Sequence, residues 1–164
     1  MPKKRAYWLM KSEPDVFSYD HLVAAKKSTT HWDGVRNYQA RNTMRDDMKV
    51  GDLVLYYHSN TKPPGIVGVA EIVREGYPDH TQFDPGDSHF DPKSKEDNPR
   101  WYMVDLRAAA ELPNYVTLDE LKANAKLQDM AVVQRGQRLS VQPVTAAEFK
   151  EVLKMGGLKA SNLP

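Results

Sequence analysis

The sequence predicts an α+β fold built on a small mixed β barrel of about five or six strands, flanked by short helices. The chain has 164 residues, a length that suits one domain with a single substantial core. Its 40% hydrophobic and 27% charged residues are ordinary values for a globular protein. Strand and helix signals do not alternate regularly along the chain, which argues against a doubly wound parallel sheet.

The first third of the chain contains two extended segments and two short helix signals. Residues 6–11 are rich in aromatic and large apolar side chains and predict a buried first strand. Ser18 is a good N-cap for a short helix that runs to about Ala25. Residues 29–32 predict a second, short extended segment, and Asn37 can cap the helix that follows it.

The rest of the chain predicts four more strands. Residues 53–59 and 66–73 should form a hairpin of central strands, because a Pro-Pro-Gly turn signal separates them. Strand patterns return at residues 101–109 and 138–142, and Pro143 should stop the last of these strands.

Two further helices are predicted by their first residues. Thr117 and Thr145 each open a capping box, in which a glutamate stands three residues after the threonine. We expect a helix to begin at each threonine, and the second helix to end at Gly156-Gly157.

The composition excludes several kinds of chemistry. The absence of cysteine excludes disulfides, thiolate metal sites and cysteine nucleophiles. The five histidines match no recognised metal-binding spacing, although His80 and His89 stand among aspartates in the segment 76–100. We therefore expect no metal, no cofactor and no catalytic residue. This acidic segment is too long for an idle connection, so we expect it to be either functional or mobile.

The beginning of the chain carries no targeting signal that we can identify. Residues 1–5 are expected to form a flexible basic start, and the apolar run after them is cut short by Lys11, too soon for a signal peptide. No apolar run approaches the roughly 20 residues that cross a bilayer. We expect a cytoplasmic protein with no membrane partner.

The stretch from Trp32 to Asn42 has the composition of a nucleobase site. It offers an aromatic ring for stacking, a flexible glycine, and side-chain amides that can bond a base edge. The formal net charge is only +1, so any nucleic-acid site must be local. We expect the Trp32 ring to face a ligand, whereas Trp8 and Tyr56 should belong to the core. Three nearby arginines are candidates for phosphate contacts, with ordinary surface charge as the alternative: Arg36, Arg41 and Arg45.

Other polar residues gather elsewhere in the chain. A second polar and basic cluster lies between Gln134 and Arg138, and one of its arginines is a candidate for a structural bridge to the acidic segment. Polar and aromatic residues also stand where strands or helices should begin or end: Ser12, Asn37, Tyr57, His58, Ser59 and Trp101.

Four segments resemble, in order, the motifs of the EVE domain family: residues 7–14, 32–42, 57–60 and 138–143. The resemblance covers about residues 6–155 and leaves residues 156–164 as a C-terminal tail. It implies a PUA-like pseudobarrel, related to the YTH and ASCH domains, whose members commonly bind nucleic acid. EVE domains are regarded as readers of modified bases in DNA, such as 5-methylcytosine and its oxidised forms. The motif positions nominate a base pocket formed by Ser12, Trp32, Asn37, Tyr57, His58 and Ser59, and they also nominate Lys11, Val35 and Trp101 for it.

The sequence and the resemblance together favour a non-enzymatic binder that flips one modified base out of the DNA stack and holds it against Trp32. Ser12, Asn37, His58 and Ser59 would read the base edge. One alternative is an RNA binder that recognises a modified base, and another is an enzyme or small-ligand sensor that uses His58. A partner protein would supply any downstream effect. We expect a cytoplasmic, nucleoid-associated location in a bacterium and a nuclear location in a eukaryote.

Overall fold

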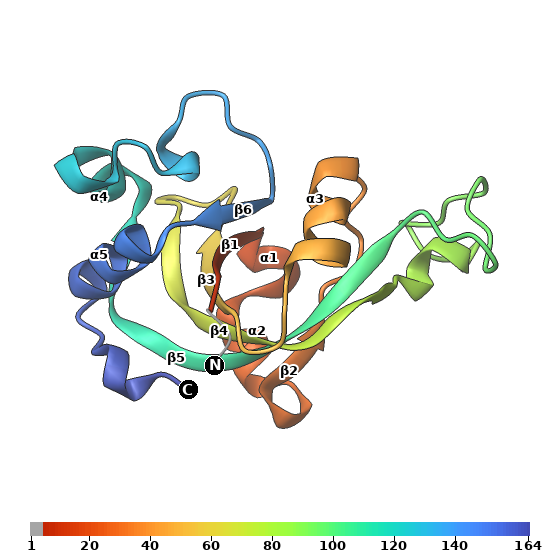
Figure 1. Ribbon diagram of the computed structural model, residues 1–164, viewed down its shortest axis with the longest axis horizontal. Helices are drawn as coiled ribbons and strands as arrows, with labels where there is room; N and C mark the ends of the chain where they lie inside the picture. The colour runs from red at the N-terminus through yellow and green to blue at the C-terminus, as the bar shows by residue number, and fades with distance from the viewer. Residues whose placement is uncertain (1–4) are drawn as a thin grey trace.

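A six-stranded mixed sheet forms the centre of the computed structural model, which describes residues 5–164 (Figure 1). The expected basic start therefore lies, apart from Arg5, outside the described residues. The strands lie in the order β2-β5-β4-β3-β1-β6. Their bounds are β1 (Tyr7–Ser12), β2 (Thr29–His31), β3 (Leu53–His58), β4 (Gly65–Pro78), β5 (Tyr102–Thr117) and β6 (Val141–Val144).

The pairing confirms a mixed sheet. Strands β1 and β3 run parallel, and every other neighbouring pair is antiparallel, including the expected central hairpin of β3 and β4. The long strands β4 and β5 shift register at several points, and such bulges bend and twist a sheet. Figure 1 shows these two strands curving around the other strands and then projecting away from them. The sheet is thus barrel-like without closing, since β2 and β6 are its edges.

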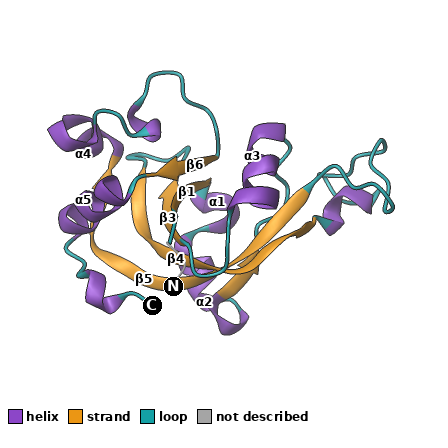
Figure 2. Ribbon diagram, viewed as in Figure 1, coloured by secondary structure: helices purple, strands orange, loops and turns teal. Residues whose placement is uncertain are grey.

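Short helices flank the sheet at both ends (Figure 2). They are α1 (Pro14–Phe17), α2 (Tyr19–Ala24), α3 (Tyr38–Asn42), α4 (Leu118–Ala123) and α5 (Ala146–Gly156), and α3 continues as a π-helical turn, η2 (Thr43–Asp47). All four expected caps are confirmed by hydrogen bonds from backbone N–H groups to the capping side chains: Ser18, Asn37, Thr117 and Thr145. Local sequence therefore determines where these helices begin.

Three strands differ from the prediction in their bounds. Strand β4 continues past residue 73 to Pro78, and β5 continues past residue 109 to Thr117, because the two strands pair from Pro78 opposite Tyr102 to Gly65 opposite Thr117. The added residues include polar side chains without a regular alternation, so the sequence pattern did not predict them as strand. Pro143 does not stop the last strand but lies within it, opposite Trp8. An edge strand tolerates proline, because the missing N–H can lie on the unpaired side.

The core consists of two buried clusters separated by the sheet. One lies under α4 and α5 and contains apolar residues such as Leu9, Leu55 and Phe149. The other lies under α1, α2 and α3 and contains Trp8 and Tyr56, which are buried as expected. Among the described residues, no helix has the length and apolar character needed to span a membrane.

Candidate functional site

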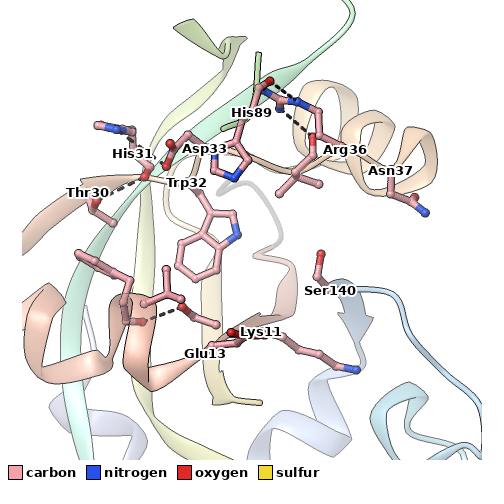
Figure 3. A pocket seen from close by; sticks show the side chains of 15 residues that line it. Lys11, Glu13, Thr30, His31, Trp32, Asp33, Arg36, Asn37, His89 and Ser140 are labelled. Carbon is pink, nitrogen blue, oxygen red and sulfur yellow. Dashed lines mark hydrogen bonds and ion pairs between the residues drawn. The ribbon is translucent and has the colours of Figure 1, made fainter. Parts of the chain in front are cut away.

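A cavity of about 650 Å³ opens beside the second core cluster, a size typical of sites for small ligands. It lies between the end of β1, helix α1, strand β2 and the segment from Trp32 to Asn37, and one residue of the acidic segment joins it (Figure 3). Its lining residues are Lys11, Ser12, Glu13, Val16, Phe17, Thr30, His31, Trp32, Asp33, Gly34, Val35, Arg36, Asn37, His89 and Ser140.

Trp32 stands at the centre of this cavity in Figure 3. Its side chain is only 8% exposed, and its ring meets the Tyr56 ring edge-on at a centroid distance of 5.5 Å. Its backbone N–H donates to the carbonyl oxygen of Val104, at 2.8 Å, which fixes the chain at this point. Trp32 is therefore both a core residue and a lining residue, held in one orientation before any ligand arrives.

The end of β1 supplies a polar wall. The Ser12 hydroxyl donates to the Phe17 carbonyl at 2.6 Å, and the Tyr56 hydroxyl donates to the same oxygen at 2.8 Å. The Ser12 oxygen, whose own proton is used, keeps lone pairs that can accept from a ligand. Burial lowers the pKa of the neighbouring Lys11 ammonium, which remains a hydrogen-bond donor at the cavity.

The segment before α3 supplies the opposite wall. Asn37 is exposed, and its side-chain oxygen accepts from the N–H of Ala40 at 3.0 Å. This cap fixes the side chain with its amide nitrogen as the remaining donor. Val35 adds a half-buried apolar surface beside it.

Arg36 lines the cavity but has its donors engaged within the protein. Its guanidinium makes five hydrogen bonds, to the His89 carbonyl twice, the Val35 carbonyl, the Asp79 carboxylate and the Thr81 hydroxyl. Since a guanidinium has five N–H groups, none remains for the phosphate that the sequence led us to expect. Arg36 instead ties the acidic segment to the cavity wall, a bridge that we expected from the Gln134–Arg138 cluster.

Asp79 is the buried partner in this bridge. Burial would raise the pKa of its carboxyl, but hydrogen bonds from Thr81, Gly34 and Arg36 outweigh burial and lower the pKa below its ordinary value of 3.8. The Gly34 N–H donates to one carboxylate oxygen at 2.8 Å, and Arg36 donates to the same oxygen at 3.0 Å. One buried carboxylate thus holds both the Trp32–Asn37 segment and the acidic segment.

His89 closes the cavity from the acidic segment. A Cβ atom added at Gly34 would lie 2.7 Å from the His89 ring, so only glycine permits this approach. The Arg36 hydrogen bonds to the His89 carbonyl hold the ring in this position. The acidic segment is therefore part of the site, and no local signal could have shown that His89 reaches a residue 55 positions earlier in the chain.

Four nominated residues lie outside the cavity lining. Tyr57 is buried in the first core cluster, and burial raises its pKa to about 12. His58 accepts from the Tyr19 N–H at 3.1 Å, and the Ser59 N–H donates to the Ser12 carbonyl at 3.0 Å. The Trp101 indole donates to Asp91 at 2.7 Å. None of the four side chains lines the cavity, and the alternation of side chains along β3 accounts for the orientation of Tyr57 toward the first core cluster.

The remaining nominated arginines lie on α3 and the turn after it. Arg41 donates to the Arg100 carbonyl at 2.8 Å and stacks over the Tyr38 ring. Arg45 forms a double hydrogen bond with Asp46 on the surface. Neither arginine lines the cavity, and both have partners already.

Several lining residues were not nominated. Glu13 lies within the first motif, residues 7–14, and Val16 and Phe17 lie shortly after it. His31 and Asp33 flank Trp32, so the positions of these residues in the sequence were a usable signal. Across residues 5–164, no cluster of three or more histidine, aspartate or glutamate side chains could hold a metal ion.

Comparisons with known proteins identify similar sequences and a similar fold. The EVE domain family model matches residues 6–155. Thymocyte nuclear protein 1 of Rattus norvegicus is 49% identical over 166 residues, which cover 91% of this chain and 73% of the relative.

Two solved structures share the fold. The DUF55 domain of human thymocyte nuclear protein 1 superposes with a TM-score of 0.88 at 47% identity, covering 94% of this chain and 100% of that chain. The human THYN1 protein in complex with 5-methylcytosine-containing DNA gives a TM-score of 0.87 at 47% identity, covering 94% and 99%. These matches confirm the expected fold class.

Proposed function

Because the chain belongs to the EVE domain family, we propose that it binds DNA carrying a modified base and holds that base, flipped out of the duplex, in the cavity beside Trp32. The observation that carries the proposal is the cavity itself, which combines a fixed aromatic ring with a few polar groups. The relative solved with 5-methylcytosine-containing DNA, similar over nearly the whole chain, supports the choice of DNA and of a cytosine derivative.

The lining groups suit the hydrogen-bonding edge of a cytosine. That edge has one amino donor and two acceptors, a ring nitrogen and a carbonyl oxygen. Ser12 offers an acceptor, and the Lys11 ammonium and the Asn37 amide offer donors. The apolar surface of Val35 and Phe17 would receive a methyl group. We propose that four lining residues determine the base preference: Ser12, Lys11, Asn37 and Val35. Four residues outside the lining would hold these side chains in place: Tyr57, His58, Ser59 and Trp101.

The energetics require both kinds of contact. Flipping a base costs a few kcal/mol, and stacking on an aromatic ring repays about 1 to 3 kcal/mol. Stacking alone therefore leaves little net affinity. Edge contacts must supply the remainder, which makes selectivity for the correct base a direct part of binding.

Duplexes that differ only in one central base test this proposal. We expect a duplex with 5-methylcytosine or an oxidised derivative to bind more tightly than one with cytosine, and to quench tryptophan fluorescence. Trp32→Phe should keep most of this preference. Trp32→Leu, which fills the space without a large aromatic face, should weaken binding of the modified duplex by about 10-fold. Circular dichroism melting checks that both variants fold, and unchanged affinity in a folded Trp32→Leu protein would contradict the proposed stacking.

RNA remains the alternative partner, and matched single-stranded RNA of the same sequence tests it. Tighter binding of the modified RNA than of the modified DNA would favour that alternative. We propose no catalytic step, because His58, the candidate catalytic base, lies outside the cavity lining and already accepts a hydrogen bond from Tyr19. Release of an altered nucleoside that depends on His58 would overturn this part of the proposal.

We also propose a nuclear location in a eukaryote and a nucleoid-associated one in a bacterium, since the site is built for DNA. Imaging of a fluorescent fusion tests this. An effector protein would have to bind outside the cavity, where it would sense the DNA-bound state.

A further inference from the structure

A turn formed by residues Gln134–Arg138 leads directly to the rim of the proposed base cavity. The Gln137 N–H donates to the Gln134 carbonyl at 3.3 Å, and Gly136 has a φ of 76°, as a tight turn requires. No atom lies within 4 Å of the position that a Cβ of Gly136 would take, so the tip faces open space. Two residues beyond the turn, Ser140 lines the cavity.

The two arginines of this turn differ from the others near the site. Arg135 and Arg138 are exposed, and neither side chain makes a hydrogen bond or an ion pair with any residue from 5 to 164. The donors of Arg36, by contrast, are all used within the protein, and those of Arg45 meet Asp46. Arg135 and Arg138 thus keep their guanidinium donors available on the turn that leads to the cavity.

Lys11 links the turn to the cavity. Its N–H donates to the Ser140 carbonyl at 2.9 Å, and its ammonium lies 3.4 Å from the Gln137 carbonyl. The Gln142 amide also donates to the Leu139 carbonyl at 2.8 Å. The base of the turn is therefore fixed to the same strand end that forms the polar wall of the cavity. Figure 3 shows Ser140 and Lys11 together on one side of Trp32.

We propose that Arg135 and Arg138 bind the DNA phosphates that flank the flipped nucleotide, which moves the phosphate-binding role from α3 to this turn. The inference rests on the proposed function. A flipped base leaves its two neighbouring phosphates at the cavity rim, and guanidinium groups bind phosphate through paired N–H donors. Phosphate contacts fix position and add affinity without reading the base. Arg135 and Arg138 therefore set how tightly DNA binds, and the cavity sets which base is preferred.

The test measures the salt dependence of binding for Arg135→Gln, Arg138→Gln and the double variant. The probes are fluorescently labelled duplexes with one central cytosine or 5-methylcytosine. Lys150→Gln is the matched control, because it removes one positive charge from an exposed position on α5, a helix that contributes no residue to the cavity lining. Each phosphate contact contributes about 0.9 to the slope of log affinity against log salt.

We expect each arginine variant to lower this slope by about 0.9, and the double variant by about 1.8. Each lost contact should weaken binding by roughly 15-fold in about 50 mM salt and roughly 4-fold in about 200 mM salt. The loss should be equal for both duplexes, so the preference ratio stays constant. Lys150→Gln should leave the slope unchanged.

The possible failures are distinguishable. A slope that the double variant leaves unchanged, or changes no more than Lys150→Gln does, overturns the role of the turn and leaves base recognition standing. A lowered slope in a protein that never prefers the modified duplex overturns base recognition alone. A parent protein that binds neither duplex overturns both. A loss confined to the 5-methylcytosine duplex shows that these arginines read the base, which also overturns the phosphate assignment.

Discussion

Arg36 and Asp79 form the contact on which the shape of the cavity depends. The arginine lies in the cavity wall and the aspartate is completely buried behind it, with 3.0 Å between the guanidinium and the carboxylate. Removing one partner of such a pair leaves a buried charge without compensation, which costs more than the pair itself contributes. The role of Arg36 is therefore structural, even though its position in the cavity wall suggests that it contacts a ligand.

The first prediction concerns this pair. Arg36→Ala should lower the free energy of unfolding by about 3 kcal/mol, because the Asp79 carboxylate would remain buried without its cation. Arg36→Lys should recover only part of the loss, since an ammonium cannot reproduce the planar fork of donors. Urea denaturation measures both. Arg45→Ala is the control and should leave the midpoint unchanged, and equal effects at the two positions would contradict the bridging role.

A second prediction follows from the lowered pKa of Asp79. A carboxyl whose pKa is lower in the folded state stabilises the fold above the pKa of the unfolded chain and loses this effect as pH falls through the folded pKa. Asp79→Asn should therefore be less stable than the parent protein near neutral pH, and the difference should shrink below about pH 4. Urea midpoints over a pH series measure it. A difference that stays constant with pH would show that Asp79 does not carry this charge effect.

The sequence could indicate Trp32 and Asn37 but not the function of Arg36. Trp32 stands among polar residues, and Asn37 precedes helix-forming residues, so both signals lie within a few positions. Apart from the Val35 carbonyl, the partners of Arg36 lie 43 and more positions away, and only the folded chain brings them together. Distance along the chain, rather than residue type, limited what could be predicted.

At the scale of elements, the helices were predictable and the long hairpin was not. Each cap is a local hydrogen bond, so Thr117 and Thr145 identify their helices directly. Strands β4 and β5 gain length only by pairing with each other, and the polar residues of their extension carry no alternating pattern. The extension of β4 leads into the acidic segment, whose His89 lines the cavity, so the missed strand end and the missed lining residue are connected.

A third prediction tests the start of this hairpin. A Cβ atom at Gly65 would lie 2.3 Å from the Val116 carbonyl oxygen, so β4 and β5 could not keep their pairing there. Gly65→Ala should lower the free energy of unfolding by about 1 to 3 kcal/mol, as overpacking does. Gly86→Ala is the control, because its Cβ would lie 3.4 Å from only one side-chain atom. Comparable stability of the two variants in urea would contradict the close approach.

At the scale of the molecule, the sheet separates the first core cluster from the cavity that we propose binds the base. The first core cluster, with α4 and α5, lies on one side of the curved sheet, and the cavity opens beside the second cluster on the other. The mixed strand order could be predicted from the irregular sequence of elements. The position of Ser12 beside Trp32 was expected only from the family resemblance, because it depends on how β1 and the Trp32 segment are placed in three dimensions. A formal net charge of +1 also limits how much of the binding energy can come from phosphates.

The last prediction concerns the salt dependence of DNA binding, which should be modest because few cations are available to meet phosphate. If Arg135 and Arg138 are the cations that meet phosphate, the slope of log affinity against log salt should be close to two times 0.9, or about 1.8. Raising salt from about 50 to about 200 mM should then weaken binding by roughly 12-fold. Fluorescence anisotropy over a salt series measures the slope with the 5-methylcytosine duplex. A loss of four or more decades would require many more phosphate contacts than the site offers, and would place a second DNA-binding surface on the molecule.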